Sequence, residues 1–284
     1  MSNQEEMVNM QENNMNTAEQ KEEKSGKRNP VFIIIVVVLS LLIAAGLTYL
    51  GRMWYLDYKS EKSIAGVESF YRETTTQEDA SLALLKDNPV DFAALQKQND
   101  ELYAWIKVPG TRVNYPMAQS KTDDEFYLHH DYLKNYLFAG TIYTESCNKK
   151  DFSDPITLVY GHNMYASEGT MFTTLHNFED RKFFDSHENF TIYTPNHILT
   201  YRIFSAFKYD NRHIMNSFHF DLEPKDLEAF QSTMLNPHST LKNVRSDVKL
   251  DKDSKVVVLS TCFSGDKSVR FLVCGVLVKD EPTK

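Results

Sequence analysis

The sequence predicts a mainly β protein: a closed β-barrel of about eight strands with helices before it, a helix inserted between late strands, and one N-terminal transmembrane helix. Short runs rich in β-branched and aromatic residues follow one another after residue 104 and are separated by turn residues, as in barrels. One helical pattern interrupts them between Tyr209 and Lys255. A long uncharged run near the N-terminus is typical of a membrane span.

The composition supports a folded domain and excludes several other classes of protein. The 284 residues are 42% hydrophobic and 25% charged, which excludes a disordered chain, a collagen-like repeat and a polytopic membrane protein. The net charge of −8 argues against nucleic acid as the partner, because phosphate binding requires clustered cations. The three cysteines are too few for a disulfide framework or a Cys-rich zinc site. We therefore expect a protein or peptide partner and at least one free thiol.

The N-terminal part of the chain divides into a polar tail and a membrane anchor. Residues 1–30 are polar and contain no aromatic residue, so we expect a disordered tail. Residues 31–50 carry no charge, and a helix of about twenty residues spans the hydrocarbon core of a bilayer. The run is too long for the apolar region of a typical signal peptide, and no cleavage site follows it, so we expect an uncleaved anchor. Four basic residues precede the span and only Arg52 follows it closely, which predicts a cytoplasmic N-terminus and an extracellular remainder.

The next segment is expected to be helical and to lead into the folded domain. Residues 51–85 are charged and carry apolar residues near a 3.6-residue spacing, which predicts a juxtamembrane helix. Asn88-Pro89 then has the pattern of a helix start, and we expect one folded domain over residues 86–284. The expected buried stripe of this second helix is Phe92, Leu95 and Leu102.

Eight runs are expected to form the strands of the barrel. In chain order they are Trp105–Val108, Val113–Met117, Leu137–Tyr143, Ile156–Tyr160, Phe190–Tyr193, Ile198–Tyr209, Lys255–Cys262 and Val269–Val278. Pro224 stands where the first residue of the inserted helix is expected, and Leu227, Phe230 and Leu235 follow at helical intervals.

Cys262, at the end of a predicted buried strand, is the candidate nucleophile. A cysteine in such a place is most often a core residue. The turn signal after it and the apolar strand that opens with Arg270 predict a hairpin, which brings Cys262 and Arg270 together at one mouth of the barrel. A guanidinium beside a thiol favours the thiolate and can hold the oxyanion of a tetrahedral intermediate. Taken alone, Arg270 has an equally good structural explanation, either as an edge-strand charge or as the partner of a carboxylate.

His162 is the candidate proton acceptor for this thiol. It lies in the loop that leaves a predicted strand, where rigid scaffolds commonly place functional side chains. Surface or structural roles are expected for the other eight histidines: His129, His130, His176, His187, His197, His213, His219 and His238. The sequence contains no His-Glu-x-x-His, no Cys-x-x-Cys and no glycine-rich phosphate loop, so we expect neither a metal site nor a cofactor.

Together these features resemble the sortases, the membrane-anchored cysteine transpeptidases of Gram-positive bacteria, and most closely class B. Thr157–Met164, with the sequence TLVYGHNM, resembles the histidine motif of the family. Leu259–Cys262 resembles its TLxTC-type cysteine motif, with Val258 in place of the first threonine, and Arg270 matches its arginine. The helix after Pro224 is similar to the long insertion between late strands of class B, and the resemblance covers residues 85–278.

The resemblance implies a sortase-type barrel in which Cys262 is the nucleophile, His162 the acid and base, and Arg270 the clamp for substrate and oxyanion. It implies cleavage of the C-terminal sorting signal of a surface protein after threonine, through a thioacyl intermediate that an amine of a peptidoglycan precursor resolves. Asn163, Ser260 and Thr261 are the expected substrate-binding residues, although Ser260 and Thr261 are equally well explained as residues that shape the strand end.

Some alternatives stay open at this point. Some class B members carry an acidic residue soon after the cysteine, whereas here three residues precede Asp266, so no fourth catalytic residue is assigned. A sortase that polymerises pilins and a surface thiol peptidase or hydrolase are the alternative enzymes. The isolated Arg270 counts against the hydrolase, because such enzymes commonly use backbone donors. The last alternative is an inactive binding domain with Cys262 in its core.

Overall fold

The structure, a computed structural model, describes residues 29–72, 86–164, 169–220, 222–263 and 266–284. The tail expected to be disordered, residues 1–30, therefore lies outside the described residues except for its last two. The chain divides after Tyr55 into two units. The sequence-based division of the chain at residues 30, 50 and 85 stays a prediction.

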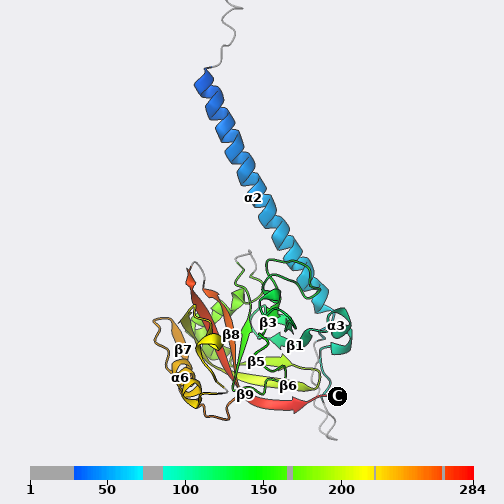
Figure 1. Ribbon diagram of the computed structural model, residues 1–284, viewed down its shortest axis with the longest axis vertical. Helices are drawn as coiled ribbons and strands as arrows, with labels where there is room; N and C mark the ends of the chain where they lie inside the picture. The colour runs from blue at the N-terminus through cyan, green and yellow to red at the C-terminus, as the bar shows by residue number, and fades with distance from the viewer. Residues whose placement is uncertain (1–28, 73–85, 165–168, 221, 264–265) are drawn as a thin grey trace, which may run out of the picture. The chain divides into compact units, whose positions relative to one another are not determined.

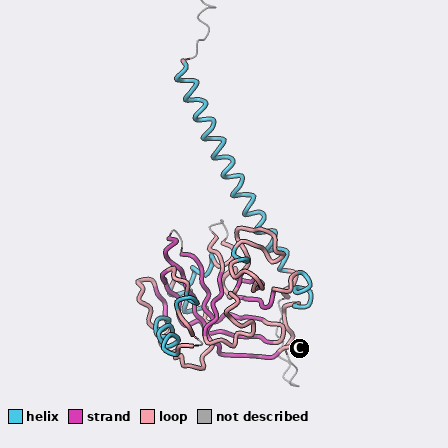
Figure 2. The backbone as a smooth tube through the Cα atoms, viewed as in Figure 1, coloured by secondary structure: helices cyan, strands magenta, loops and turns pink. Residues whose placement is uncertain are grey.

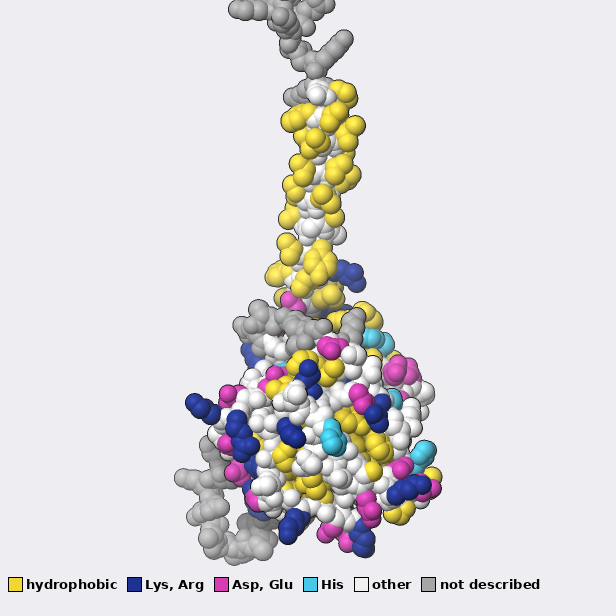
Figure 3. Space-filling view, turned by 90° about the vertical axis from the view of Figure 1, so that its left-hand side faces the viewer, with side chains coloured by type: hydrophobic (Ala, Val, Ile, Leu, Met, Phe, Trp, Pro, Cys, Tyr) yellow, Lys and Arg dark blue, Asp and Glu magenta, His cyan; other side chains and the backbone are white. Residues whose placement is uncertain are grey.

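Helix α2, Pro30–Glu68, contains the predicted apolar span. Residues 31–50 are exposed, and their side chains are apolar along the helix (Figure 3). The helix is long and apolar enough to cross a membrane, by length and composition. The helix ends at Glu68, before the predicted helix end at residue 85. The chain after it pairs with the segment before α3 instead: Tyr71 pairs with Val90, and the Asp91 N–H donates to the Phe70 carbonyl at 2.9 Å. Residues 73–85 of the predicted juxtamembrane helix lie outside the described residues.

Within residues 56–284, one sheet closes into a barrel (Figure 1). The nine strands found among the described residues are β1 Leu102–Lys107, β2 Asn114–Ala118, β3 Ile142–Tyr143, β4 Ile156–Tyr160, β5 Asn189–Tyr193, β6 His197–Asp210, β7 Lys242–Val244, β8 Val256–Phe263 and β9 Asp266–Pro282. Their order is β5-β1-β2-β3-β4-β8-β9-β6-β7, and β5 also pairs with β6. That last pairing closes eight strands into a ring and leaves β7 as an extension beside β6. The predicted closed barrel of about eight strands is confirmed.

Within residues 56–284, the helices lie at the margin of the strands (Figure 2). Beyond α2 they are α3 Phe92–Gln98, η1 Phe126–Leu128, η2 Thr173–Glu179, α4 Arg181–Ser186, α5 Ile214–Ser217 and α6 Pro224–Leu235. The predicted inserted helix is confirmed as α6, with Pro224 in its first turn and Leu227 and Phe230 buried. Helix α3 begins after Asp91, whose carboxylate accepts the Ala94 N–H at 2.9 Å, and the predicted helical residue Leu102 instead opens β1.

The predicted strand Leu137–Tyr143 is wrong over most of its length, since only Ile142–Tyr143 pairs as β3. Gly140 has φ of +62° and its N–H donates to the Leu137 carbonyl at 3.0 Å, so the chain turns there. A Cβ on Gly140 would lie 2.4 Å from the Tyr127 carbonyl oxygen. Leu137 and Ala139, which suggested a strand, are buried from within this turn, whereas Phe138 is exposed.

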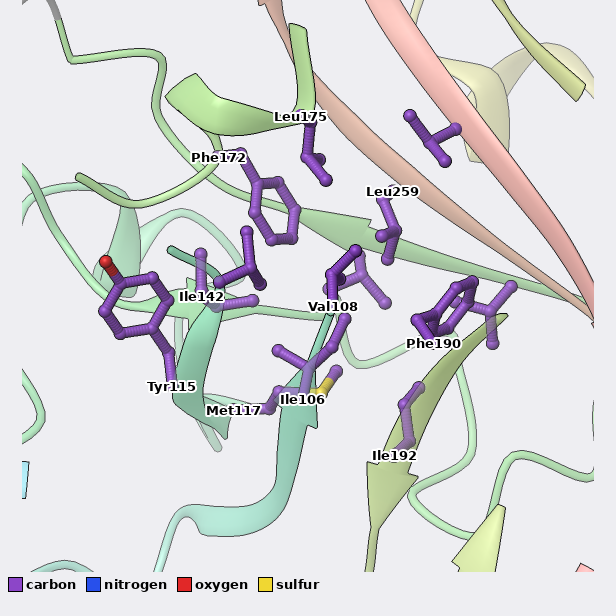
Figure 4. Packing of buried hydrophobic residues seen from close by; sticks show 14 of the residues in the cluster. Ile106, Val108, Tyr115, Met117, Ile142, Phe172, Leu175, Phe190, Ile192 and Leu259 are labelled. Carbon is purple, nitrogen blue, oxygen red and sulfur yellow. The ribbon is translucent and has the colours of Figure 1, made fainter. Parts of the chain in front are cut away.

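Strand β8 is buried on both faces, which explains its unbroken apolar sequence. Val257 and Leu259 belong to the barrel interior, where side chains from several strands converge (Figure 4). Val256 and Val258 belong to a second cluster on the outer face, which includes Phe230 of α6. A strand buried on both faces favours a continuous apolar run, which in β8 covers Val256–Leu259 and is followed by the buried Ser260 and Thr261. The helix inserted before β8 therefore covers the outer face of the barrel and leaves the end of the strand for the site.

Candidate active site

The nucleophile candidate lies directly opposite the arginine, as predicted. Cys262 of β8 and Arg270 of β9 are Cα partners in an antiparallel pair, and both are half-buried. Side chains directly opposite each other in such a pair lie on the same face of the sheet. The predicted turn residues Ser264 and Gly265 between them lie outside the described residues. By the alternation of β8, Cys262 is on the outer face, together with Ser260 and Val258.

His162 reaches the same edge of the sheet because β4 and β8 are parallel. The two strands pair up to Tyr160 and Ser260, and the Gly161 N–H then donates to the Ser260 carbonyl at 3.2 Å. A Cβ on Gly161 would lie within 2.7 Å of the side chains of Ile142 and Phe172, so the close approach requires glycine. The residue after it, His162, therefore leaves the sheet beside the end of β8.

The surroundings of the His162 ring favour its neutral form. Its Nε2 lies 2.9 Å from the Leu128 carbonyl oxygen, which can only accept, so Nε2 carries a proton and Nδ1 is the basic atom. Phe138, which is 44% exposed, and His129 each lie 5.5 Å from the ring in stacked geometry. Burial lowers the pKa of His162 below its ordinary value; the bond to Leu128 opposes this effect and the neighbouring His129 adds to it.

Cys262, His162 and Arg270 line one cleft of about 200 Å³. Its other lining residues are Glu125, Leu128, Tyr143, Glu145, Tyr160, Gly161, Asn211, Arg212, His213, Ile214, Ser260 and Thr261. A hydrogen bond of 2.7 Å between His213 Nε2 and Glu145 Oε1 links two segments of the wall, and burial raises the pKa of Glu145. A larger hollow of about 510 Å³ near Tyr103 has no cysteine among its described lining residues, so the thiol chemistry points to the smaller cleft.

The other two cysteines are poor nucleophiles. Cys274 is fully buried in the cluster under α6, and burial raises the pKa of its thiol. Cys147 lies beside Glu145, and desolvation together with that carboxylate raises the pKa of Cys147 to about 11. Both thiols stay protonated near neutral pH, and the thiolate is the nucleophilic form of cysteine. Cys262 therefore stays the candidate nucleophile among the three cysteines.

The three predicted substrate-binding residues have different surroundings. Ser260 and Thr261 are only 4% and 2% exposed at the end of β8. The Asn163 side chain donates from Nδ2 to the carbonyl of Cys262 at 3.0 Å and lies 3.0 Å from His176 Nε2. His176 also approaches the Cys262 carbonyl at 3.1 Å, with Glu179 on its far side at 2.5 Å. Sequence reasoning gave His176 only a surface or structural role, since three-residue spacing to a glutamate is a weak signal.

Known proteins resemble this chain in sequence and in fold. No family model matches the chain. It is 29% identical over 168 residues to the sortase B of Listeria monocytogenes, which covers 59% of this chain and 65% of that protein, just under two thirds of the relative's length. Among solved structures, the sortase B from B. anthracis has a TM-score of 0.64 and 26% identity, with 80% of this chain and 99% of that chain covered. A class B sortase of Streptococcus pyogenes involved in pilus biogenesis has a TM-score of 0.56 and 27% identity, with 66% and 98% covered.

Proposed function

Because this chain is a member of the sortase family and is most similar to class B, we propose that it joins surface proteins to an amine of the cell wall as a cysteine transpeptidase. The observation that carries the proposal is the single cleft that Cys262, His162 and Arg270 share. Neither a metal nor a cofactor takes part in this scheme, since a thiolate, a base and a fixed cation suffice for acyl transfer.

In the first half of the proposed reaction, a surface protein is cleaved at its C-terminal sorting signal. His162 accepts the thiol proton at Nδ1, and the sulfur of Cys262 attacks the carbonyl carbon of the threonine. Arg270 stabilises the negative charge that develops on the carbonyl oxygen. The bond from carbon to nitrogen breaks, the leaving amine takes the proton from His162, and a thioester on Cys262 remains.

In the second half, the amine of a peptidoglycan precursor resolves the thioester. His162 accepts a proton from the attacking amine, the bond from carbon to sulfur breaks, an amide forms, and the proton returns from His162 to the released thiolate of Cys262. Burial of the His162 ring supports this role, because a neutral imidazole is the form that accepts a proton.

We also propose that the protein is anchored in the cell membrane. The apolar part of α2 supports one transmembrane anchor, and the basic residues before it support a cytoplasmic N-terminus and an extracellular catalytic domain. We infer that residues 1–30 are a cytoplasmic tail and residues 86–284 the catalytic domain. The burial of Ser260 and Thr261 supports a role in shaping the strand end, whereas Asn163 acts through the backbone of Cys262.

A pilin-polymerising sortase is the second candidate, and the pilus-biogenesis sortase of S. pyogenes among the similar structures favours it. The two functions share the chemistry at Cys262 and differ in the amine that resolves the thioester. An amine of a pilin serves in one case and an amine of a wall precursor in the other. Competition between the two amines for the same acyl-enzyme separates them.

The test is peptide cleavage by the full chain in detergent, with and without an added amine. Sorting-signal peptides of varied sequence are incubated with the protein, and the products are identified by mass spectrometry. A new amide that forms only with the amine supports the transpeptidase. Hydrolysis alone points to a thiol peptidase. An absence of any reaction, together with a thiol at Cys262 that is inert to mild alkylation, points to a binding domain.

A further inference from the structure

The ring of His176 lies between the backbone of the nucleophile and a carboxylate. Its Nδ1 is 2.5 Å from Glu179 Oε1, and its Nε2 is 3.1 Å from the carbonyl oxygen of Cys262. The same Nε2 is 3.0 Å from Asn163 Nδ2, which itself donates to that carbonyl. Three polar groups from β8, η2 and the loop after β4 therefore meet at one point.

The chemistry of these atoms fixes how the ring is used. The Glu179 carboxylate accepts, so Nδ1 carries the proton that lies between them. Nε2 then either donates to the Cys262 carbonyl or, when bare, accepts from the second N–H of Asn163. In both protonation states His176 ties η2 to the pair formed by Cys262 and Asn163. The protonated ring is thus linked to the Cys262 carbonyl directly, and the neutral ring is linked to it through Asn163, whose side chain donates to both.

Aromatic packing and hydrogen bonds hold the His176 ring in position. It stacks on Phe271 at 4.9 Å between centroids and meets Phe263 edge-on at 5.5 Å. Its side chain is 16% exposed, so water has little access to the bonds. The Asn243 side chain of β7 donates to the carbonyl of Glu179 at 3.0 Å and thereby fixes the end of η2 that carries the carboxylate. A polar group supported on both sides in this way is preorganised.

We propose that His176, supported by Glu179, is a positioning residue that fixes the carbonyl of Cys262 and so orients the thiol toward His162 and Arg270. The inference rests on the proposed function, because orientation of the thiol matters only for attack on a substrate. A small displacement of an attacking atom costs a large factor in rate without weakening substrate binding. His176 therefore acts on kcat and leaves KM unchanged.

The test compares three variants of the full chain in detergent. His176→Phe keeps an aromatic ring against Phe271 but removes both nitrogens. His176→Gln restores a polar group near the place of Nε2. His187→Phe is the matched control, because His187 is also half-buried and stacks on a phenylalanine, Phe183, at 3.9 Å, and its described contacts do not include Cys262.

With a sorting-signal peptide, we expect His176→Phe to lower kcat about tenfold and to leave KM within about twofold. The kcat of His176→Gln is expected to lie within about threefold of that of the unmodified protein. The kcat of the His187→Phe control is expected to equal that of the unmodified protein. An unchanged kcat in His176→Phe overturns the inference, as does a rise in KM alone, an equal loss in the control, or a failure of glutamine to restore the rate. If His176→Phe does not fold, Glu179→Ala replaces it, and kcat must fall in the same way.

A second measurement needs no substrate and separates this inference from the proposed function. Hydrogen exchange of the backbone at residues 259–263 is followed by mass spectrometry. We expect faster exchange in His176→Phe and not in the control, because the end of β8 loses one of its attachments. If the unmodified protein cleaves no peptide, the proposed function fails, and hydrogen exchange alone then tests the positioning role of His176. Unchanged exchange in His176→Phe then overturns the positioning role.

Discussion

Replacement of Arg270 by lysine tests whether the guanidinium takes part in the reaction. Lysine keeps the positive charge but loses the planar fork with its directed N–H donors. Arg270 is half-buried, lies opposite Cys262 in the β8–β9 pair and lines the cleft. If it holds the oxyanion, the loss corresponds to removal of one oxyanion-hole donor, which costs about 2.7–4 kcal/mol or about 10²–10³ in rate. If it is only a surface charge, the change is worth less than about 1 kcal/mol.

The assay is single-turnover acylation by a sorting-signal peptide, with the melting temperature measured in parallel. Arg212→Lys is the matched control, because Arg212 also lines the cleft but has its guanidinium paired with Asp210 at 2.6 Å. We expect Arg270→Lys to lower the acylation rate by at least about a hundredfold with little change in melting temperature, and the control to stay near normal. An acylation rate of Arg270→Lys within about threefold of normal would refute the reasoning, since surface charges have effects of that size.

Three further predictions follow from the geometry of the site. Gly161→Ala is expected to cost about 1–3 kcal/mol of stability and to lower kcat, because the new Cβ would lie within 2.7 Å of two side chains. A melting temperature and a kcat equal to those of the unmodified protein would contradict this prediction. Burial lowers the pKa of His162, so the imidazole stays neutral to a lower pH than a free histidine. We therefore expect kcat/KM to fall with acidification only below about pH 6.5. A pH–rate profile in which kcat/KM already falls above that pH would exclude His162 as the base. Cys147→Ala and Cys274→Ala are expected to keep peptide cleavage, with a lower melting temperature only for the buried Cys274; loss of cleavage in either variant would reassign the nucleophile.

The barrel and the pairing of its last strands follow from local patterns in the sequence. The unbroken apolar run of β8 reflects burial on both faces, and a turn signal followed by a second apolar run predicts the hairpin that sets Arg270 opposite Cys262. His162 was predicted because it lies in the loop that leaves a strand pattern, whereas the parallel pairing of β4 with β8 that brings it beside Cys262 was not predicted. These features depend on residues close together in the chain or on strand periodicity.

Other features depend on contacts between distant residues and were not predictable. The turn at Gly140 replaces a predicted strand, because a positive φ and contact with the Tyr127 carbonyl outweigh the apolar pattern. Strand β7 has three residues and pairs only with one end of β6, so it has no periodicity to detect. His176 reaches the Cys262 carbonyl 86 residues away, and only the folded chain brings them together.

In the proposed reaction, Cys262 carries the acyl group between the two substrates. The most direct test is the intact mass of the full chain after brief reaction with a sorting-signal peptide, followed by digestion to locate the adduct. We predict a thioester on Cys262 with the mass of the peptide up to its threonine, which disappears when an amine is added and is absent in Cys262→Ala. An adduct on another residue, or peptide cleavage that persists in Cys262→Ala, would contradict the account.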